Sequence, residues 1–224
     1  MVPDWLWMLS IVALALAVLS AGAIAFDILA GRRQKMWVMN LVWPITALYF
    51  GPLGFWAYAR MGRAPARAAG KGDGVERPFW QTAFVATSHC GAGCVVGDTV
   101  GEWGIFLAGL TLFGSKLLTA YAADFTLAYL LCIIFQFFTI APMRKLGVRD
   151  GIVAALKADT ISLVAFEVGM FAFMAVNRLL LFESPPEPNT ATYWFLMQVA
   201  MIVGFATSYP ANWWLVKSGV KEAM

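Results

Sequence analysis

Seven apolar runs, each followed by a short polar or charged stretch, make up most of the chain. Each run approaches the roughly 20 residues that an α-helix needs to cross the hydrocarbon core of a bilayer. The pattern therefore predicts an all-α fold, a polytopic membrane helix bundle of about seven transmembrane helices. We expect tight turns at Glu102–Gly104 and at Ala123 and Asp124. The predicted spans are Trp5–Phe26, Met36–Tyr58, Phe79–Gly101, Ile105–Ala122, Phe125–Ile140, Thr160–Phe182 and Tyr193–Val216.

The longest polar stretch, rich in alanine, glycine and arginine, is RMGRAPARAAGKGDGVERP. It divides the chain into an N-terminal two-helix segment (residues 1–60), a polar linker (61–78) and a five-helix domain (79–224). Pro44 and Pro52 lie within the second predicted span. Proline removes a helical hydrogen bond, so we expect a kink there.

Composition supports an integral membrane protein. Hydrophobic residues make up 61% of the chain and charged residues 13%, and the mean hydropathy is +0.72, whereas soluble domains carry about 25% charged residues. The lipid bilayer is therefore an expected partner. The net charge of +3 does not indicate nucleic-acid binding, because the lysines and arginines gather at the ends of the spans.

An odd number of spans places the two termini on opposite sides of the membrane. The side of the C-terminus carries nine lysines and arginines, and the other side carries five. Because cytoplasmic loops carry the excess of these cations, we predict the N-terminus out and the C-terminus in. The nine are Arg32, Arg33, Lys35, Arg144, Lys145, Arg149, Lys157, Lys217 and Lys221, and the five are Arg60, Arg63, Arg67, Lys71 and Arg77.

The stretch SHCGAGCVVGDTVGE contains the only histidine and two of the three cysteines of the chain. On an α-helix, sulfur and carboxyl groups recur here at every fourth position, so they form one stripe. Glycines on the same face let a neighbouring helix approach closely. The stripe comprises Cys90, Cys94, Asp98 and Glu102, and the glycines are Gly93, Gly97 and Gly101.

Pairs of sulfur ligands four residues apart occur on three of the predicted spans. Such pairs share a helix face and lie about 6 Å apart, close enough to bind one ion. Thiolate and thioether sulfur select Cu(I) over hard cations. All three pairs lie roughly 12 to 15 Å deep, so they can meet in one layer of the bundle. The predicted metal ligands are His89, Cys90, Cys94, Met170, Met174, Met197 and Met201.

Three further polar residues, Asp98, Glu167 and Asn212, are expected near this site as accessory or proton-carrying groups. A carboxyl group within lipid is costly and suggests a function. On a regular helix His89 points about 140° away from Cys94, so its role as a ligand requires a distorted helix. Cys132 is expected to be a packing residue, because cysteine is often buried.

Two motifs, HCGAGCVVGD and YPANWWLVKSGVKEAM, resemble the bacterial membrane-protein family catalogued as domain of unknown function 4396. The resemblance covers residues 79–224 and implies a bacterial inner (plasma) membrane location, but no activity. It carries over two sets of residues, without assigned roles. They are His89, Cys90, Cys94 and Asp98, and Asn212, Trp213, Trp214, Lys217, Gly219 and Lys221.

These patterns favour a protein that binds Cu(I) within its helix bundle for transport, storage or delivery to a copper protein or chaperone, rather than an enzyme. One alternative is a redox enzyme that uses the thiols of Cys90 and Cys94 or a His/Met haem. Another is a proton or cation pathway through Glu167 and the stripe. A single histidine argues against the usual bis-histidine haem. Seven spans are also similar to microbial rhodopsins, but Lys217 and Lys221 lie at the end of the last span, which argues against retinal.

Overall fold

The structure, a computed structural model, describes residues 2–34, 36–64 and 78–221. Within these ranges it contains helices and no strands. The central part of the expected polar linker, residues 65–77, lies outside the described residues. The elements are α1 (Asp4–Leu29), α2 (Met39–Phe50), α3 (Pro52–Ala57), η1 (Tyr58–Gly62), α4 (Phe79–Ala108), α5 (Lys116–Arg144), α6 (Val148–Val176), η2 (Asn177–Leu181) and α7 (Ala191–Lys217).

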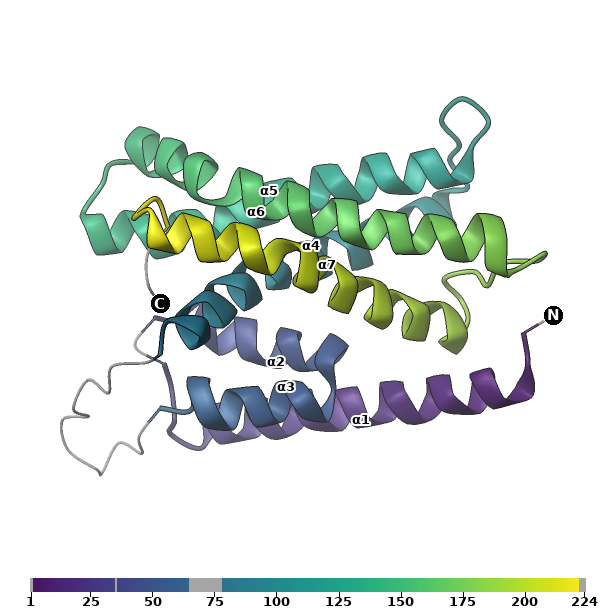
Figure 1. Cartoon of the computed structure of the whole chain (residues 1–224), viewed down its shortest axis with the longest axis horizontal. Coiled ribbons are helices and arrows are strands. Elements are labelled where there is room, and N and C mark those ends of the chain that lie inside the picture. Colours follow the sequence, from purple (N-terminus) through teal and green to yellow (C-terminus); the bar gives the residue numbers. More distant parts are fainter. Residues whose placement is uncertain (1, 35, 65–77, 222–224) are drawn as a thin grey trace.

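Five long helices, α1 and α4 to α7, run along the long axis of the molecule (Figure 1). Four helical segments among the described residues are long and apolar enough to cross a membrane, which supports a membrane protein. These segments are α1, α5, α6 together with η2, and α7. The fifth long helix, α4, packs against α2, α5, α6 and α7. Its polar side chains therefore face other helices rather than lipid.

The second predicted span is wrong, because the chain turns back halfway. Gly51 has a φ of 57°, a conformation that favours glycine, and Pro52 starts α3 in the reverse direction. With 12 residues, α2 is about 18 Å long, too short to cross the bilayer. Arg63 returns to the end of α1, where it forms an ion pair with Asp27 at 2.9 Å. The segment from α2 to η1 is therefore a re-entrant helical hairpin.

The predicted turns at Glu102–Gly104 and at Ala123 and Asp124 are also wrong, since these residues lie inside α4 and α5. The separate fourth span does not exist, and a count of seven spans is not confirmed. The acidic residues suggested exposed turns at the membrane surface. Instead, Glu102 and Asp124 are buried between helices.

The re-entrant hairpin gathers the basic connections at one end of the bundle, which we call the basic end (Figure 1). Arg63, which was expected on the opposite side, pairs with Asp27 near the end of α1 and so belongs to the basic end. The cations of this end within the described residues include Arg32, Arg33, Arg63, Arg144, Lys145, Arg149 and Lys217. The start of α1 and the end of α7 lie at opposite ends of the bundle (Figure 1). The predicted orientation in the membrane stays a prediction.

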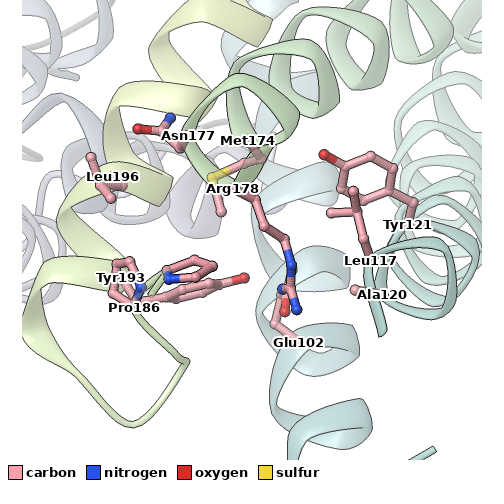
Figure 2. A pocket seen from close by; sticks show the side chains of 11 residues that line it. Glu102, Leu117, Ala120, Tyr121, Met174, Asn177, Arg178, Pro186, Tyr193 and Leu196 are labelled. Carbon is pink, nitrogen blue, oxygen red and sulfur yellow. The ribbon is translucent and has the colours of Figure 1, made fainter. Parts of the chain in front are cut away.

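A cavity of about 30 Å³ lies at the opposite end of the bundle, which we call the Glu102 cavity. The side chains of Glu102 on α4, Tyr121 on α5 and Tyr193 on α7 line it, together with Arg178 on η2 (Figure 2). Arg178 and Glu102 point toward one another in this view. The cavity therefore brings polar groups from four helical elements to the end of the bundle that faces away from the basic connections.

Candidate metal centre

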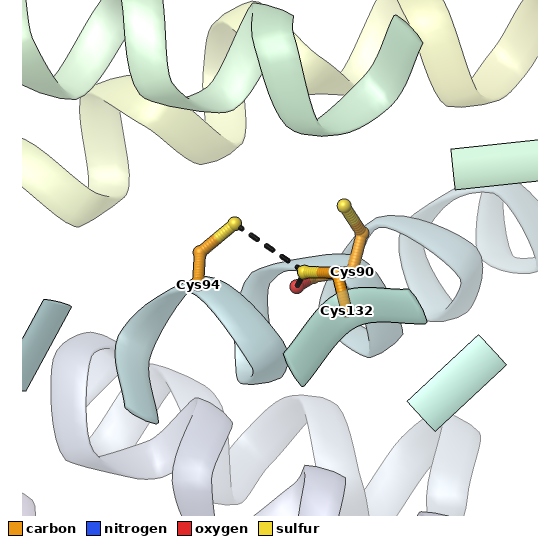
Figure 3. A group of neighbouring side chains, drawn as sticks. All are labelled: Cys90, Cys94 and Cys132. Atoms are coloured by element: carbon orange, nitrogen blue, oxygen red, sulfur yellow. Dashed lines mark hydrogen bonds between the residues drawn. The ribbon is translucent and has the colours of Figure 1, made fainter. Parts of the chain in front are cut away.

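Three thiols meet in the centre of the bundle, and we call Cys90, Cys94 and Cys132 the thiol cluster. Their Sγ atoms all lie within 4.8 Å of one another. The Sγ atoms of Cys94 and Cys132 are 3.7 Å apart, and Cys132 donates a hydrogen bond of 3.2 Å to the carbonyl of Cys90 (Figure 3). All three cysteines are free and fully buried. The cluster is thus closed off from lipid and water.

The thiol cluster depends on close packing between α4 and α5. A Cβ atom on Gly93 would lie 2.6 Å from Cys132 Sγ, and one on Gly97 would lie 2.3 Å from the backbone nitrogen of Ala128. A Cβ atom on Gly101 would lie 2.2 Å from the Asp124 carboxyl. The predicted glycine face therefore does admit a neighbouring helix. These contacts fix which part of α5 faces the stripe.

The sulfur geometry fits a single soft metal ion. Metal–thiolate bonds of about 2.3 Å allow two ligand sulfurs to be as much as about 4.6 Å apart. The 3.7 Å separation of Cys94 and Cys132 lies within this limit, and all three Sγ atoms lie within 4.8 Å of one another. Thiolates bind Cu(I), zinc and iron–sulfur clusters. Protein zinc sites almost always have four ligands, and this cluster supplies three thiols.

His89 points away from the thiol cluster. Its Nε2 lies 3.0 Å from Thr139 Oγ1 on α5. Thr139 in turn donates to the carbonyl of Phe135, so the imidazole Nε2–H is the donor to Thr139. The Nδ1 atom has no hydrogen-bond partner among the described residues. Because α4 is a continuous α-helix through this region, the distortion that a histidine ligand requires is not present.

The predicted methionine ligands divide into two groups. Met170, Met197 and Met201 are buried in the same apolar cluster as the three cysteines. Met174 is less buried and lines the Glu102 cavity. Met197 and Met201 also line a second cavity, of about 230 Å³, that borders α1. Met170 therefore remains a thioether neighbour of the thiols, whereas the other three face cavities.

Carboxyl groups lie between the thiol cluster and the Glu102 cavity, and we call this set the carboxyl row. Glu102 interacts electrostatically with Asp124, and Asp98 interacts with both of them and with Glu167. Glu167 also interacts with Cys94. The row therefore extends from the thiol cluster toward the cavity. Two of its members, Asp98 and Glu102, belong to the stripe predicted from the sequence. Its members are Glu102 and Asp98 on α4, Asp124 on α5 and Glu167 on α6.

A hydrogen-bonded network lies on the other side of the thiol cluster, and we call it the Lys221 network. Lys221 Nζ donates to Asp159 Oδ1 at 2.7 Å and to Asn212 Oδ1 at 2.8 Å. Ser162 Oγ lies 3.0 Å from Asp159 Oδ1 and 3.5 Å from Cys90 Sγ. Ser208 accepts from Asn212 and donates to the carbonyl of Ser162. The thiol cluster is therefore linked to the basic end through hydrogen bonds.

Lys221 is fully buried although it lies beyond the last turn of α7. Burial lowers the pKa of Lys221, but the neighbouring Asp159 carboxylate raises it, and the net effect is a raised pKa. The side chain is therefore a cation held inside the protein. The nearest titratable groups around it are Asp159 on α6, His89 and Cys90 on α4, and Cys132 on α5.

Sequence reasoning missed Cys132, Asp159 and Lys221. One available signal for Cys132 was its spacing: Asp124, Ala128 and Cys132 recur at every fourth position, which complements the glycines of α4. No local pattern links Asp159 with Lys221, which are 62 positions apart. Asn212 was expected as an accessory group, and it contacts Lys221 rather than the thiols.

The comparison with protein families matches one model, described as Domain of unknown function (DUF4396), over residues 79–221. The match covers more than half of the chain, so the protein belongs to this family. It includes every residue of the thiol cluster, the carboxyl row and the Lys221 network. No curated protein and no solved structure matches the chain.

Proposed function

We propose that this protein, whose family has no assigned activity, binds a soft monovalent metal ion, Cu(I). The site is the thiol cluster within a membrane-embedded helix bundle. The observation that carries the proposal is the meeting of three buried thiols within 4.8 Å of one another. Cys90, Cys94 and Cys132 would be the ligands. The thiolates would supply both the soft donors and the negative charge that the cation requires in an apolar interior.

Transport or delivery of copper fits the surroundings of the site better than storage. Polar side chains continue from the thiol cluster toward both ends of the bundle. The gathering of Arg and Lys at the basic end favours a cytoplasmic location for that end, with the N-terminus outside. By resemblance to the family, the membrane would be a bacterial inner membrane, and a copper protein or chaperone would be the partner.

Metal analysis of the purified protein tests this proposal. The protein is loaded with Cu(I) under reducing conditions, washed, and analysed for copper, zinc and iron. We expect stoichiometric copper, which is lost in Cys94→Ser and Cys132→Ser and weakened in Cys90→Ser. Met143→Leu is the matched control, because Met143 is an exposed sulfur residue on the same helix as Cys132. Absence of bound copper from the folded, reduced protein would contradict the proposal.

The same preparation tests the rival thiol redox function. Cys94 and Cys132 lie on different helices with their sulfur atoms 3.7 Å apart, so they form a better disulfide pair than Cys90 and Cys94. A thiol titration before and after mild oxidation, followed by mass spectrometry, detects such a pair. A reversible disulfide between Cys94 and Cys132, with no retained metal, would favour the redox function over copper binding.

A further inference from the structure

The carboxyl row contains buried oxygen atoms that the protein itself does not satisfy. Asp98, Asp124 and Glu167 are each at most 1% exposed. Both carboxyl oxygens of each residue have no hydrogen-bond partner within the part of the chain that the structure describes. Buried polar groups in proteins nearly always have a partner, and an unpaired one costs free energy. Three such groups in a row therefore indicate a place that accommodates a polar or charged ligand.

The positions of these groups trace a route. Along α4, Glu102, Asp98 and Cys94 are separated by four residues each, so each step is about 6 Å along the helix axis. Asp124 packs against Gly101, next to the first step. Glu167 interacts with both Asp98 and Cys94, at the second step. The route begins at the Glu102 cavity and ends at the thiol cluster.

The Lys221 network on the other side has the opposite character. The Lys221 ammonium, the Asn212 amide and the hydroxyls of Ser162 and Ser208 all have hydrogen-bond partners. Asp159 accepts two hydrogen bonds through Oδ1, while its buried Oδ2 has no hydrogen-bond partner among the described residues. A fixed ammonium group at this position repels a metal cation and occupies the carboxylate that would otherwise attract one. The basic end of the site is therefore closed to cations.

The segment that carries Lys221 lies outside α7, in a turn of its own. Residues 218–221 fold back under the end of α7, with Gly219 at a φ of 72°. The N–H groups of Gly219 and Val220 donate to the carbonyls of Val216 and Leu215, a Schellman motif. The N–H of Lys221 also donates to the carbonyl of Leu215, so the turn and the side-chain bonds of Lys221 hold the segment.

We propose, on the basis of the copper site proposed above, that the metal cation reaches the thiols from the Glu102 cavity through the carboxyl row. The ion pair of Lys221 with Asp159 is the gate that closes the thiol site toward the basic end. The carboxyl oxygens act as successive weak partners for a dehydrated soft cation, and the thiols bind it tightly. Release to the basic end requires Lys221 to leave Asp159.

Uptake of Ag⁺, a stable monovalent soft cation, into proteoliposomes tests the route. Asp98→Asn and Glu167→Gln remove one ionisable carboxyl group each and keep the shape of the side chain. We expect both variants to lose Ag⁺ uptake while they still bind Cu(I) in detergent. Glu187→Gln is the matched control, because Glu187 is an exposed carboxyl at the same end of the bundle, and it should transport normally. Wild-type uptake by both carboxyl variants would overturn the route.

Lys221→Met tests the gate in the same assay, with Lys217→Met as the control because Lys217 is exposed at the same end. We expect Lys221→Met to release preloaded Ag⁺ from the thiol site faster than the wild type does, and Lys217→Met to behave as the wild type. If Lys221→Met does not fold, Asp159→Asn/Lys221→Met removes both charges and should also release faster. Unchanged release would overturn the gate. Loss of copper binding in the wild type would instead refute the proposed function.

Discussion

The two sides of the thiol cluster differ in how their buried polar groups are satisfied. Toward the Glu102 cavity, Asp98, Asp124 and Glu167 are buried without hydrogen-bond partners among the described residues. Toward the basic end, Lys221 and its neighbours form a bonded network in which only Asp159 Oδ2 has no partner among the described residues. The polar groups on one side of the thiol cluster therefore stabilise the fold, whereas burial of the carboxyl groups on the other side costs free energy. Unsatisfied carboxyl groups next to a thiol site add nothing to the stability of the fold, and the proposed cation route gives them a function.

The largest effect on stability is expected from breaking the Lys221 network. Removing one partner of a buried ion pair leaves an uncompensated charge and typically costs about 3 to 5 kcal/mol. Lys221→Met should lower the free energy of unfolding by this amount, measured by denaturant titration in detergent micelles. The double variant Asp159→Asn/Lys221→Met should recover most of the loss. Equal stability of the single and double variants would show that the pair is not coupled.

The next largest effect on stability is expected from the close contact between α4 and α5, which supports both sides of the thiol cluster. Gly97→Ala places a Cβ atom 2.3 Å from the backbone of Ala128. Overpacking of this kind costs about 1 to 3 kcal/mol. Gly104→Ala is the control, since nothing lies within 4 Å of its Cβ position, and it should be neutral or stabilising. Thermal unfolding in detergent compares the two, and a stable Gly97→Ala protein would argue against the close approach of α4 and α5.

A smaller effect is expected on the carboxyl side. Asp98→Asn breaks no hydrogen bond in the described structure, so the free energy of unfolding should change by less than about 1 kcal/mol or increase. Denaturant titration, side by side with Asp159→Asn, measures the contrast between the two sides. A loss in Asp98→Asn as large as in Asp159→Asn would remove the distinction between them.

The smallest effect is expected at Met197 and Met201. Exchange of Met for Leu conserves volume and usually costs less than about 1.5 kcal/mol. Because both methionines line the cavity that borders α1, Met197→Leu and Met201→Leu should also retain bound copper. A competition titration with a Cu(I) chelator measures this. Weaker Cu(I) binding by either variant would show that its methionine is a ligand in addition to the three thiols.

Local periodicity was sufficient for two of the long helices, α1 and α7, and for one face of the site. The predicted ranges Trp5–Phe26 and Tyr193–Val216 lie inside α1 and α7, and the interior face with Cys90 and Cys94 is confirmed. Hydropathy alone could not distinguish a full span from the re-entrant hairpin, because the reversal depends on the backbone of a single residue, Gly51. Hydropathy also placed Glu102 and Asp124 at turns, because a carboxyl group buried within the membrane costs free energy.

Partners from distant segments could not be predicted from the sequence. Cys132 was expected to be a packing residue. Its orientation toward the stripe follows only from its contact with the glycines of α4, which is a different helix. Lys221 looked like one more cation at the end of a span, because its pairing with Asp159 depends on the fold of the whole C-terminal half. Such pairings are set by tertiary packing rather than by any pattern within one helix.

The re-entrant hairpin also determines how the protein can be divided. Since the hairpin enters and leaves at one end, residues 1–64 traverse the bundle once, through α1, while α4 to α7 traverse it four times. A chain that starts at Phe79 would begin α4 and finish α7 on the basic side, whereas α1 begins at the opposite end from the end of α7. A reporter domain fused ahead of Phe79, in place of residues 1–78, would therefore report from the opposite compartment to one fused at the natural N-terminus.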